Sequence, residues 1–119
     1  MIVRCLIVDD NRSFLEAART LLEREGLTVV GLASTTAGAL REVEALRPDV
    51  VLVDVWLGPE NGFELARRLV AADVGAAVIL TSTSSEADLA DLVALIPGAG
   101  FLSKSELSAD EVRRLLVRN

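Results

Sequence analysis

Short apolar runs alternate with stretches of helical periodicity along the whole chain. The runs rich in Val, Leu and Ile, which we expect to form strands, are residues 2–8, 27–33, 49–55, 76–81 and 99–103. Apolar side chains recur at the spacing of one helix face in residues 14–22, 37–46, 63–70, 89–96 and 112–116. Helix-ending residues (Gly26, Pro48) and N-cap residues (Asn61, Ser85, Ser108) flank these segments. The pattern therefore predicts five strand–helix units in succession.

Strands that alternate with helices predict an α/β domain with a parallel sheet and right-handed crossovers. The 119-residue chain is too short for a TIM barrel, which takes roughly 250 residues. We therefore expect residues 1–119 to form one (βα)5 domain, a doubly wound five-stranded parallel sheet with the flavodoxin-like order 2-1-3-4-5. No linker, low-complexity tract or internal repeat interrupts the pattern.

Composition narrows the functional classes. Only 3 % of the residues are aromatic, so the core must be aliphatic, and the net charge of −6 disfavours direct contact with nucleic acid. The chain contains no histidine, which excludes Ser-His-Asp catalysis and most zinc sites. A single cysteine, Cys5, favours the reducing cytoplasm. The N-terminal apolar run is too short to span a bilayer, and it is a poor signal peptide, so we expect no membrane contact.

Polar side chains stand where the expected strands end. Asp9 and Asp10 follow the first strand, Asp54 closes the third, Thr81 the fourth, and Lys104 follows the fifth. Lys104 is the single lysine of the chain, whose other basic residues are all arginine. In a doubly wound sheet the ligand binds beyond the carboxyl ends of the strands. These five residues are therefore the candidate site.

The chemistry of this set points to magnesium and a phosphoryl group. Three carboxylates about 4 Å apart repel one another by roughly 4 kcal/mol per pair at an effective dielectric constant near 20. A hard dication offsets this repulsion, and Mg²⁺ binds through carboxylates and water. With Mg²⁺ and the ammonium of Lys104 the charges sum to zero, so the site admits a phosphoryl dianion. Asp54 is then the nucleophile, while Thr81 and Lys104 contact phosphoryl oxygens.

Each of these residues also has a simpler interpretation. Asp9 and Asp10 are favourable caps for the first helix, Thr81 is a common strand residue, and lysine is usually solvated. Asp54 is harder to explain in this way, because a carboxylate within an apolar strand is costly unless it is paired or bound to metal. The occurrence of such residues at four strand ends together favours the site.

Four segments carry a resemblance to a known family. They are LIVDDN at 6–11, VVLVDVWLGPENGFEL at 50–65, VILTS at 78–82 and GFLSK at 100–104. In this order and spacing the chain resembles, over essentially its whole length, the CheY-like receiver domain of bacterial two-component response regulators.

The resemblance implies an Mg²⁺-dependent phosphoacceptor site. Asp54 is then the phosphoacceptor and a metal ligand, Asp10 binds Mg²⁺ directly, and Asp9 binds it through water. The main-chain carbonyl of Trp56 completes the protein's share of the metal shell.

The resemblance also implies a switch. Thr81 and Lys104 bind phosphoryl oxygens, and Phe101 turns inward as Thr81 moves; a purely structural role for Phe101 as a strand residue stays open. Trp56 and Thr83 occupy the positions that tune the phosphoryl lifetime. The indole of Trp56 is expected to shield the phosphoryl group and slow its hydrolysis.

Partners follow from the same resemblance. A histidine kinase or a histidine phosphotransfer protein supplies the phosphoryl group, and a homodimer forms through the fourth helix, fifth strand and fifth helix. The domain catalyses its own phosphorylation and slow dephosphorylation, but it is chiefly a signalling switch. Two contexts stay open: a stand-alone regulator, or the receiver part of a longer chain such as a DNA-binding transcriptional regulator.

Several residues depart from the family pattern. Gly58 and Ser105 stand where proline is common, and Pro97 stands where glycine is frequent. The serine makes a cis peptide after Lys104 less expected, because a non-proline cis bond costs about 2.5–4 kcal/mol.

The same residues bear on three rival functions. A hydrolase with an aspartyl nucleophile needs a second acid two positions later, where this chain has Trp56 after Asp54 and Asn11 after Asp9. Nucleotide binding is disfavoured because no glycine-rich loop follows the first strand. A receiver fold that serves as an unphosphorylated interaction module stays open.

Overall fold

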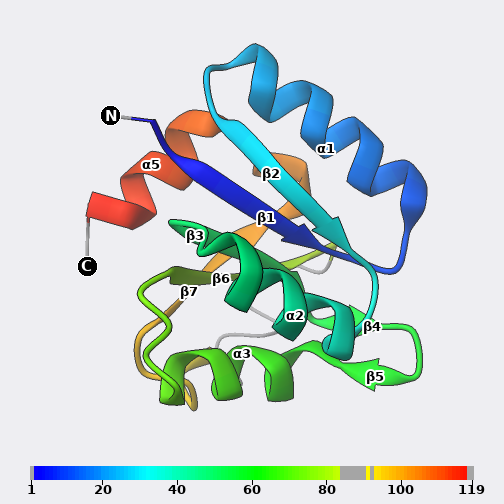
Figure 1. Ribbon diagram of the computed structural model, residues 1–119, viewed down its shortest axis with the longest axis vertical. Coiled ribbons are helices and arrows are strands. Elements are labelled where there is room, and N and C mark those ends of the chain that lie inside the picture. The colour runs from blue at the N-terminus through cyan, green and yellow to red at the C-terminus, as the bar shows by residue number, and fades with distance from the viewer. Residues whose placement is uncertain (1, 84–90, 92, 118–119) are drawn as a thin grey trace.

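A five-stranded parallel sheet forms the centre of the computed structural model, which describes residues 2–83, 91 and 93–117 (Figure 1). Its strands are β1 (Arg4–Val8), β2 (Thr28–Ala33), β3 (Val50–Asp54), β6 (Ala77–Ser82) and β7 (Ala99–Ser103). Their spatial order is β2-β1-β3-β6-β7. Counted along the chain this is the order 2-1-3-4-5, so the predicted fold class and strand order are confirmed.

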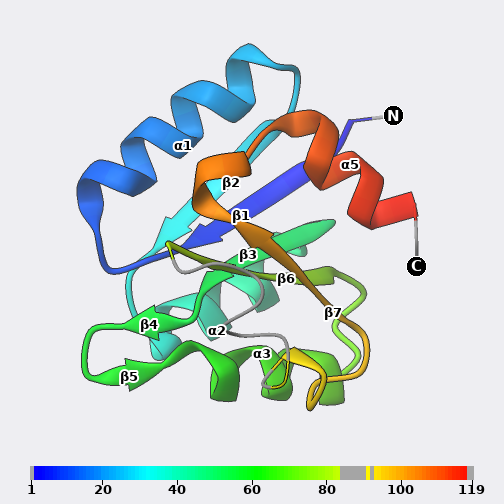
Figure 2. The same ribbon diagram turned by 180° about the vertical axis from the view of Figure 1, so that it is seen from behind.

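Helices cover both faces of the sheet. They are α1 (Arg12–Arg24), α2 (Thr36–Leu46), α3 (Gly62–Ala71) and α5 (Ala109–Val117), and a short 3₁₀ helix, η1 (Lys104–Glu106), follows β7. α1 and α5 lie on one face, and α2 and α3 lie on the other (Figures 1 and 2). Most of the helix expected at residues 89–96, with its cap at Ser85 and Asp88, falls outside the described residues. Within the described part of the chain, no helix has both the length and the apolarity to cross a bilayer.

The sheet divides an aliphatic core into two layers. Successive side chains of a strand point to opposite faces, so Leu6 and Val8 pack toward α2 and α3, while Cys5 and Ile7 pack toward α1 and α5. Every residue of β3 is buried, including the carboxylate-bearing Asp54 at its end. The low aromatic content is therefore matched by a core of Val, Leu, Ile and Ala, as the composition predicted.

Polar side chains cap the N-termini of α1, α2, α3 and α5. The side-chain acceptors are Asn11 for Phe14 N–H, Thr35 for Gly38 N–H, Asn61 for Phe63 N–H and Ser108 for Glu111 N–H, at 2.8–3.1 Å. The predicted starts at Asn61 and Ser108 are thus confirmed. The first helix is capped by Asn11, so the interpretation of Asp9 and Asp10 as its N-cap is wrong.

A small antiparallel hairpin, which the hydrophobic pattern did not predict, connects β3 to α3. It consists of β4 (Trp56–Leu57) and β5 (Glu60–Asn61), with Trp56 paired to Asn61 and Leu57 to Glu60. Strands of two residues are too short to show a period-2 alternation, which is why periodicity misses them. The turn is formed by Gly58, whose φ of +60° suits glycine, and by the proline after it.

Gly62, at the start of α3, packs directly against the end of β3. A Cβ atom at this position would lie 1.8 Å from the carbonyl oxygen of Asp54. The absence of a side chain therefore lets the helix approach the strand end that carries the candidate nucleophile.

Replacing Gly62 with alanine should lower the free energy of unfolding by at least about 2 kcal/mol, because the backbone of β3 or α3 must shift to accept the methyl group. Urea denaturation followed by circular dichroism measures the loss. Gly100→Ala is a matched control, since the nearest atom to its Cβ is 3.7 Å away; its stability should fall little or rise by up to about 1 kcal/mol. Equal stabilities for the two variants would contradict the close approach at Gly62.

Candidate functional site

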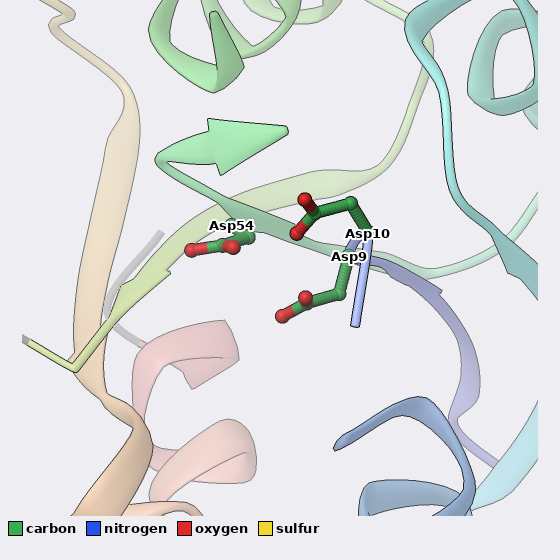
Figure 3. Close-up of side chains that lie close together, drawn as sticks. All are labelled: Asp9, Asp10 and Asp54. Carbon is green, nitrogen blue, oxygen red and sulfur yellow. The ribbon is translucent and has the colours of Figure 1, made fainter. Parts of the chain in front are cut away.

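Three carboxylates meet at the carboxyl edge of the sheet. Asp9 and Asp10 follow β1, and Asp54 is the last residue of β3, the strand that pairs with β1 up to Val8 and Val53. One oxygen from each of the three carboxylates lies within 4.8 Å of the others, and Figure 3 shows the three side chains gathered there. The neighbouring parallel strands therefore bring together the acidic residues that the sequence predicted as a cluster.

The three carboxylates differ in their exposure to solvent. Asp9 is completely buried and Asp54 is 6 % exposed, whereas Asp10 is exposed. Asp9 Oδ1 accepts a hydrogen bond of 2.9 Å from the backbone N–H of Asn11. Asp9 Oδ2 forms an ion pair with Lys104 but makes no hydrogen bond within the described part of the chain. Because this buried oxygen accepts no hydrogen bond from the described residues, it still has a lone pair that can coordinate a cation.

Lys104 places its ammonium among these carboxylates. Its Nζ lies 2.6 Å from Asp9 Oδ2 and 3.5 Å from Asp54 Oδ2, and its side chain is only 12 % exposed. The interpretation of Lys104 as a solvated surface charge is therefore wrong. Sequence reasoning missed one neighbour of this lysine: Nζ stands over the ring of Phe14, 4.2 Å from its centroid. Helical periodicity marked Phe14 only as an apolar position.

The surroundings of Asp54 disfavour its charged form. Burial, and secondly the negative charge of Asp9, raise the pKa of Asp54 from 3.8 to about 6. The ammonium of Lys104 and a hydrogen bond from the backbone N–H of Trp56 act in the opposite direction and limit the rise. Near neutral pH, Asp54 is therefore mostly ionised, although its surroundings make ionisation less favourable than it is in water.

The remaining predicted site residues differ in their burial. Thr81 is 2 % exposed and pairs with Asp54 in the β3–β6 register. Phe101 is half-buried on β7 and packs against the core, whereas Thr83 is exposed. The indole of Trp56 is 60 % exposed and lines an apolar groove with Phe63 and Ile96, among other residues. The peptide bond after Lys104 is trans.

The residues present fit a divalent cation. At 4.8 Å and an effective dielectric constant near 20, each pair of carboxylates repels by roughly 3.5 kcal/mol, and the single ammonium offsets only part of this. Carboxylate oxygens are the ligands that Mg²⁺ takes in proteins. The free coordination capacity of Asp9 Oδ2 and the exposure of Asp10 leave room for an ion and its water ligands.

Comparison with known proteins identifies the family. The family model of the response regulator receiver domain matches residues 5–116. The chain belongs to this family of two-component signalling domains. The solved two-component response regulator of the LuxR family from Aurantimonas sp. superposes with a TM-score of 0.85 and 26 % identity, over 100 % of this chain and 88 % of that one.

Curated relatives place receiver domains of this kind in longer proteins. The response regulator GacA of Pseudomonas viridiflava is 29 % identical over 95 % of this chain and 53 % of the relative. A protein-glutamate methylesterase/protein-glutamine glutaminase of Halalkalibacterium halodurans is 31 % identical over 97 % of this chain and 35 % of the relative. The chain thus spans about a third to a half of these relatives.

Asp54→Asn should stabilise the metal-free domain by about 1–3 kcal/mol at pH 8, because the folded state no longer holds a charged carboxylate in an unfavourable pocket. The pKa of Asp54 is higher in the folded than in the unfolded state. Ionisation of Asp54 therefore destabilises the folded state; this effect is absent below pH 4 and grows until about pH 6. The advantage of the variant should therefore vanish near pH 4. Urea denaturation in EDTA at several pH values measures it, and a variant less stable than the wild type at pH 8 would contradict this electrostatic account.

Proposed function

We propose that this receiver domain takes a phosphoryl group onto Asp54 in an Mg²⁺-dependent reaction, from the phosphohistidine of a histidine kinase or a histidine phosphotransfer protein. One observation carries the proposal: a carboxylate at the end of a wholly buried strand lies beside two further carboxylates and a nearly buried ammonium. The chain has no histidine of its own, so the donor must be another protein or a small phosphoryl compound.

Four residues would hold the metal. They are Asp9, Asp10, Asp54 and Trp56, the last through its main-chain carbonyl. When bound, Mg²⁺ supplies positive charge that offsets the carboxylates and the phosphoryl oxygens. Three carboxylates, the dication and Lys104 then sum to zero charge before the phosphoryl group enters.

The chain's own residues perform the transfer. A carboxylate oxygen of Asp54 attacks phosphorus in line with the leaving imidazole. The phosphorus–nitrogen bond of the donor breaks as the phosphorus–oxygen bond forms, and the imidazole nitrogen then takes a proton from solvent. Lys104 and Thr81 bind the phosphoryl oxygens, the first as a point charge and the second as a hydrogen-bond donor.

Phosphorylation then changes an output surface. The added group carries about two negative charges at neutral pH, and Thr81 moves toward it while Phe101, on the adjacent strand, turns inward. The surface around β7 and α5, together with the helix expected at residues 89–96, is thereby altered for a partner, a second copy of the chain or an attached output domain such as a DNA-binding domain. On this proposal the domain acts in the cytoplasm.

Acetyl phosphate tests the acceptor. Incubation with Mg²⁺ should add the mass of one phosphoryl group to the wild type and to Asp73→Asn, which replaces an exposed carboxylate after α3. Asp54→Asn, or EDTA in place of Mg²⁺, should abolish the adduct. Intact-mass spectrometry measures all four. A persistent adduct on Asp54→Asn would contradict the assignment, whereas no adduct on the wild type and no response to beryllofluoride would favour an unphosphorylated interaction module.

The lifetime of the phosphoryl group tests the role of Trp56. Trp56→Asn should hydrolyse faster than the wild type, by about threefold or more, if the indole slows the approach of water to the acyl phosphate. Decay of the phosphorylated mass after removal of acetyl phosphate gives the rate. Equal rates would show that the indole, exposed as it is, does not shield the site.

A further inference from the structure

A closed chain of contacts links the first turn of α1 to Lys104. Asp9 Oδ1 accepts a hydrogen bond from Asn11 N–H at 2.9 Å, and Asn11 Oδ1 accepts one from Phe14 N–H at 3.1 Å. The ring of Phe14 faces Lys104 Nζ at 4.2 Å, and this Nζ returns to Asp9 Oδ2 at 2.6 Å. The helix cap that begins α1 therefore also fixes where the aromatic ring stands relative to the ammonium.

The ring limits where the ammonium can go. Lysine has a flexible four-carbon stem and a compact charge, and here two carboxylates at 2.6 and 3.5 Å attract it. A cation close to the face of an aromatic ring is attracted by the ring quadrupole, and more strongly when it is shielded from water. Lys104 is 12 % exposed and Phe14 is half-buried against the α1–α5 core layer, so this attraction acts with little screening by solvent.

We infer that Phe14 is a positioning residue for Lys104: its ring holds the ammonium between Asp9 and Asp54, and so sets how tightly the site binds a phosphoryl group. The inference rests on the proposed function only in assigning the phosphoryl group as the ligand of Lys104. The contact itself is a property of the metal-free domain. A leucine or valine in place of the phenylalanine would fill part of the same space but would have no face to attract the cation.

The single lysine of the chain makes the contact directly observable. In protein grown with ¹³C,¹⁵N-lysine, the side-chain signals of Lys104 are the only lysine signals, and protons over an aromatic face shift upfield. The Hε signals of the metal-free wild type should lie upfield of those of free lysine. Phe14→Leu should return them toward the free value, whereas Leu21→Ala, which trims another partly buried side chain of α1 in the same core layer, should not.

Beryllofluoride, a stable mimic of the phosphoryl group, tests the consequence. At saturating Mg²⁺, with Trp56 fluorescence as the signal, Phe14→Leu should weaken its affinity by about threefold to tenfold, the range expected for a partly buried cation–π contact. Substitution by 3,4,5-trifluorophenylalanine at position 14 keeps the shape but weakens the negative face of the ring, and it should give an intermediate loss. Leu21→Ala should lower the melting temperature while leaving this affinity within about twofold of the wild type.

The two experiments separate the inference from the proposed function. Unshifted Hε signals in the wild type, or a trifluorinated variant that binds beryllofluoride like the wild type, would overturn the role of Phe14. A wild type with shifted Hε signals that binds no beryllofluoride would confirm the contact but overturn the phosphoryl assignment, and with it the effect of Phe14 on affinity.

Discussion

Electrostatic repulsion among Asp9, Asp10 and Asp54 is the constraint on which the rest of the site depends. Adjacent parallel strands β1 and β3 end at one edge of the sheet, so the fold forces these carboxylates to within 4.8 Å instead of letting them separate. Lys104 offsets part of the repulsion, whereas burial and, secondly, the charge of Asp9 raise the pKa of Asp54. On the proposed function, a divalent cation offsets the remaining negative charge before the phosphoryl group enters.

The surrounding elements keep the strained cluster in place. β3 is buried along its whole length, and Gly62 lets α3 pack directly on the carbonyl of Asp54. On the other side, the cap of α1 joins Asp9 to Asn11 and brings the ring of Phe14 to Lys104. The stability of the core therefore supports a site that is itself unfavourable until a ligand binds, as is common for functional sites.

Sequence patterns predict those parts of the structure that repeat over many residues. The strands follow from the apolar runs, and their order follows from the alternation of strands with helices, which is typical of a doubly wound sheet. The acidic cluster and the place of Lys104 follow from the rule that parallel strands end at one edge of the sheet. The hairpin at Trp56–Asn61 was missed because two-residue strands show no period. The contact between Phe14 and Lys104 was missed because nothing in the sequence relates the first turn of one helix to the end of a distant strand. Likewise, only the structure shows that Asp9 is buried while its neighbour Asp10 is exposed.

The proposed function requires that the acidic cluster bind a divalent cation. Isothermal titration calorimetry of the metal-free wild type with Mg²⁺ should show one saturable site, and the free energy of unfolding should rise with Mg²⁺ concentration as linkage requires. Asp10→Asn, a substitution at an exposed position, should fold normally and lose at least about tenfold in Mg²⁺ affinity. A wild type without saturable binding, or an Asp10→Asn variant that binds Mg²⁺ as tightly as the wild type, would contradict the metal site proposed for this edge of the sheet.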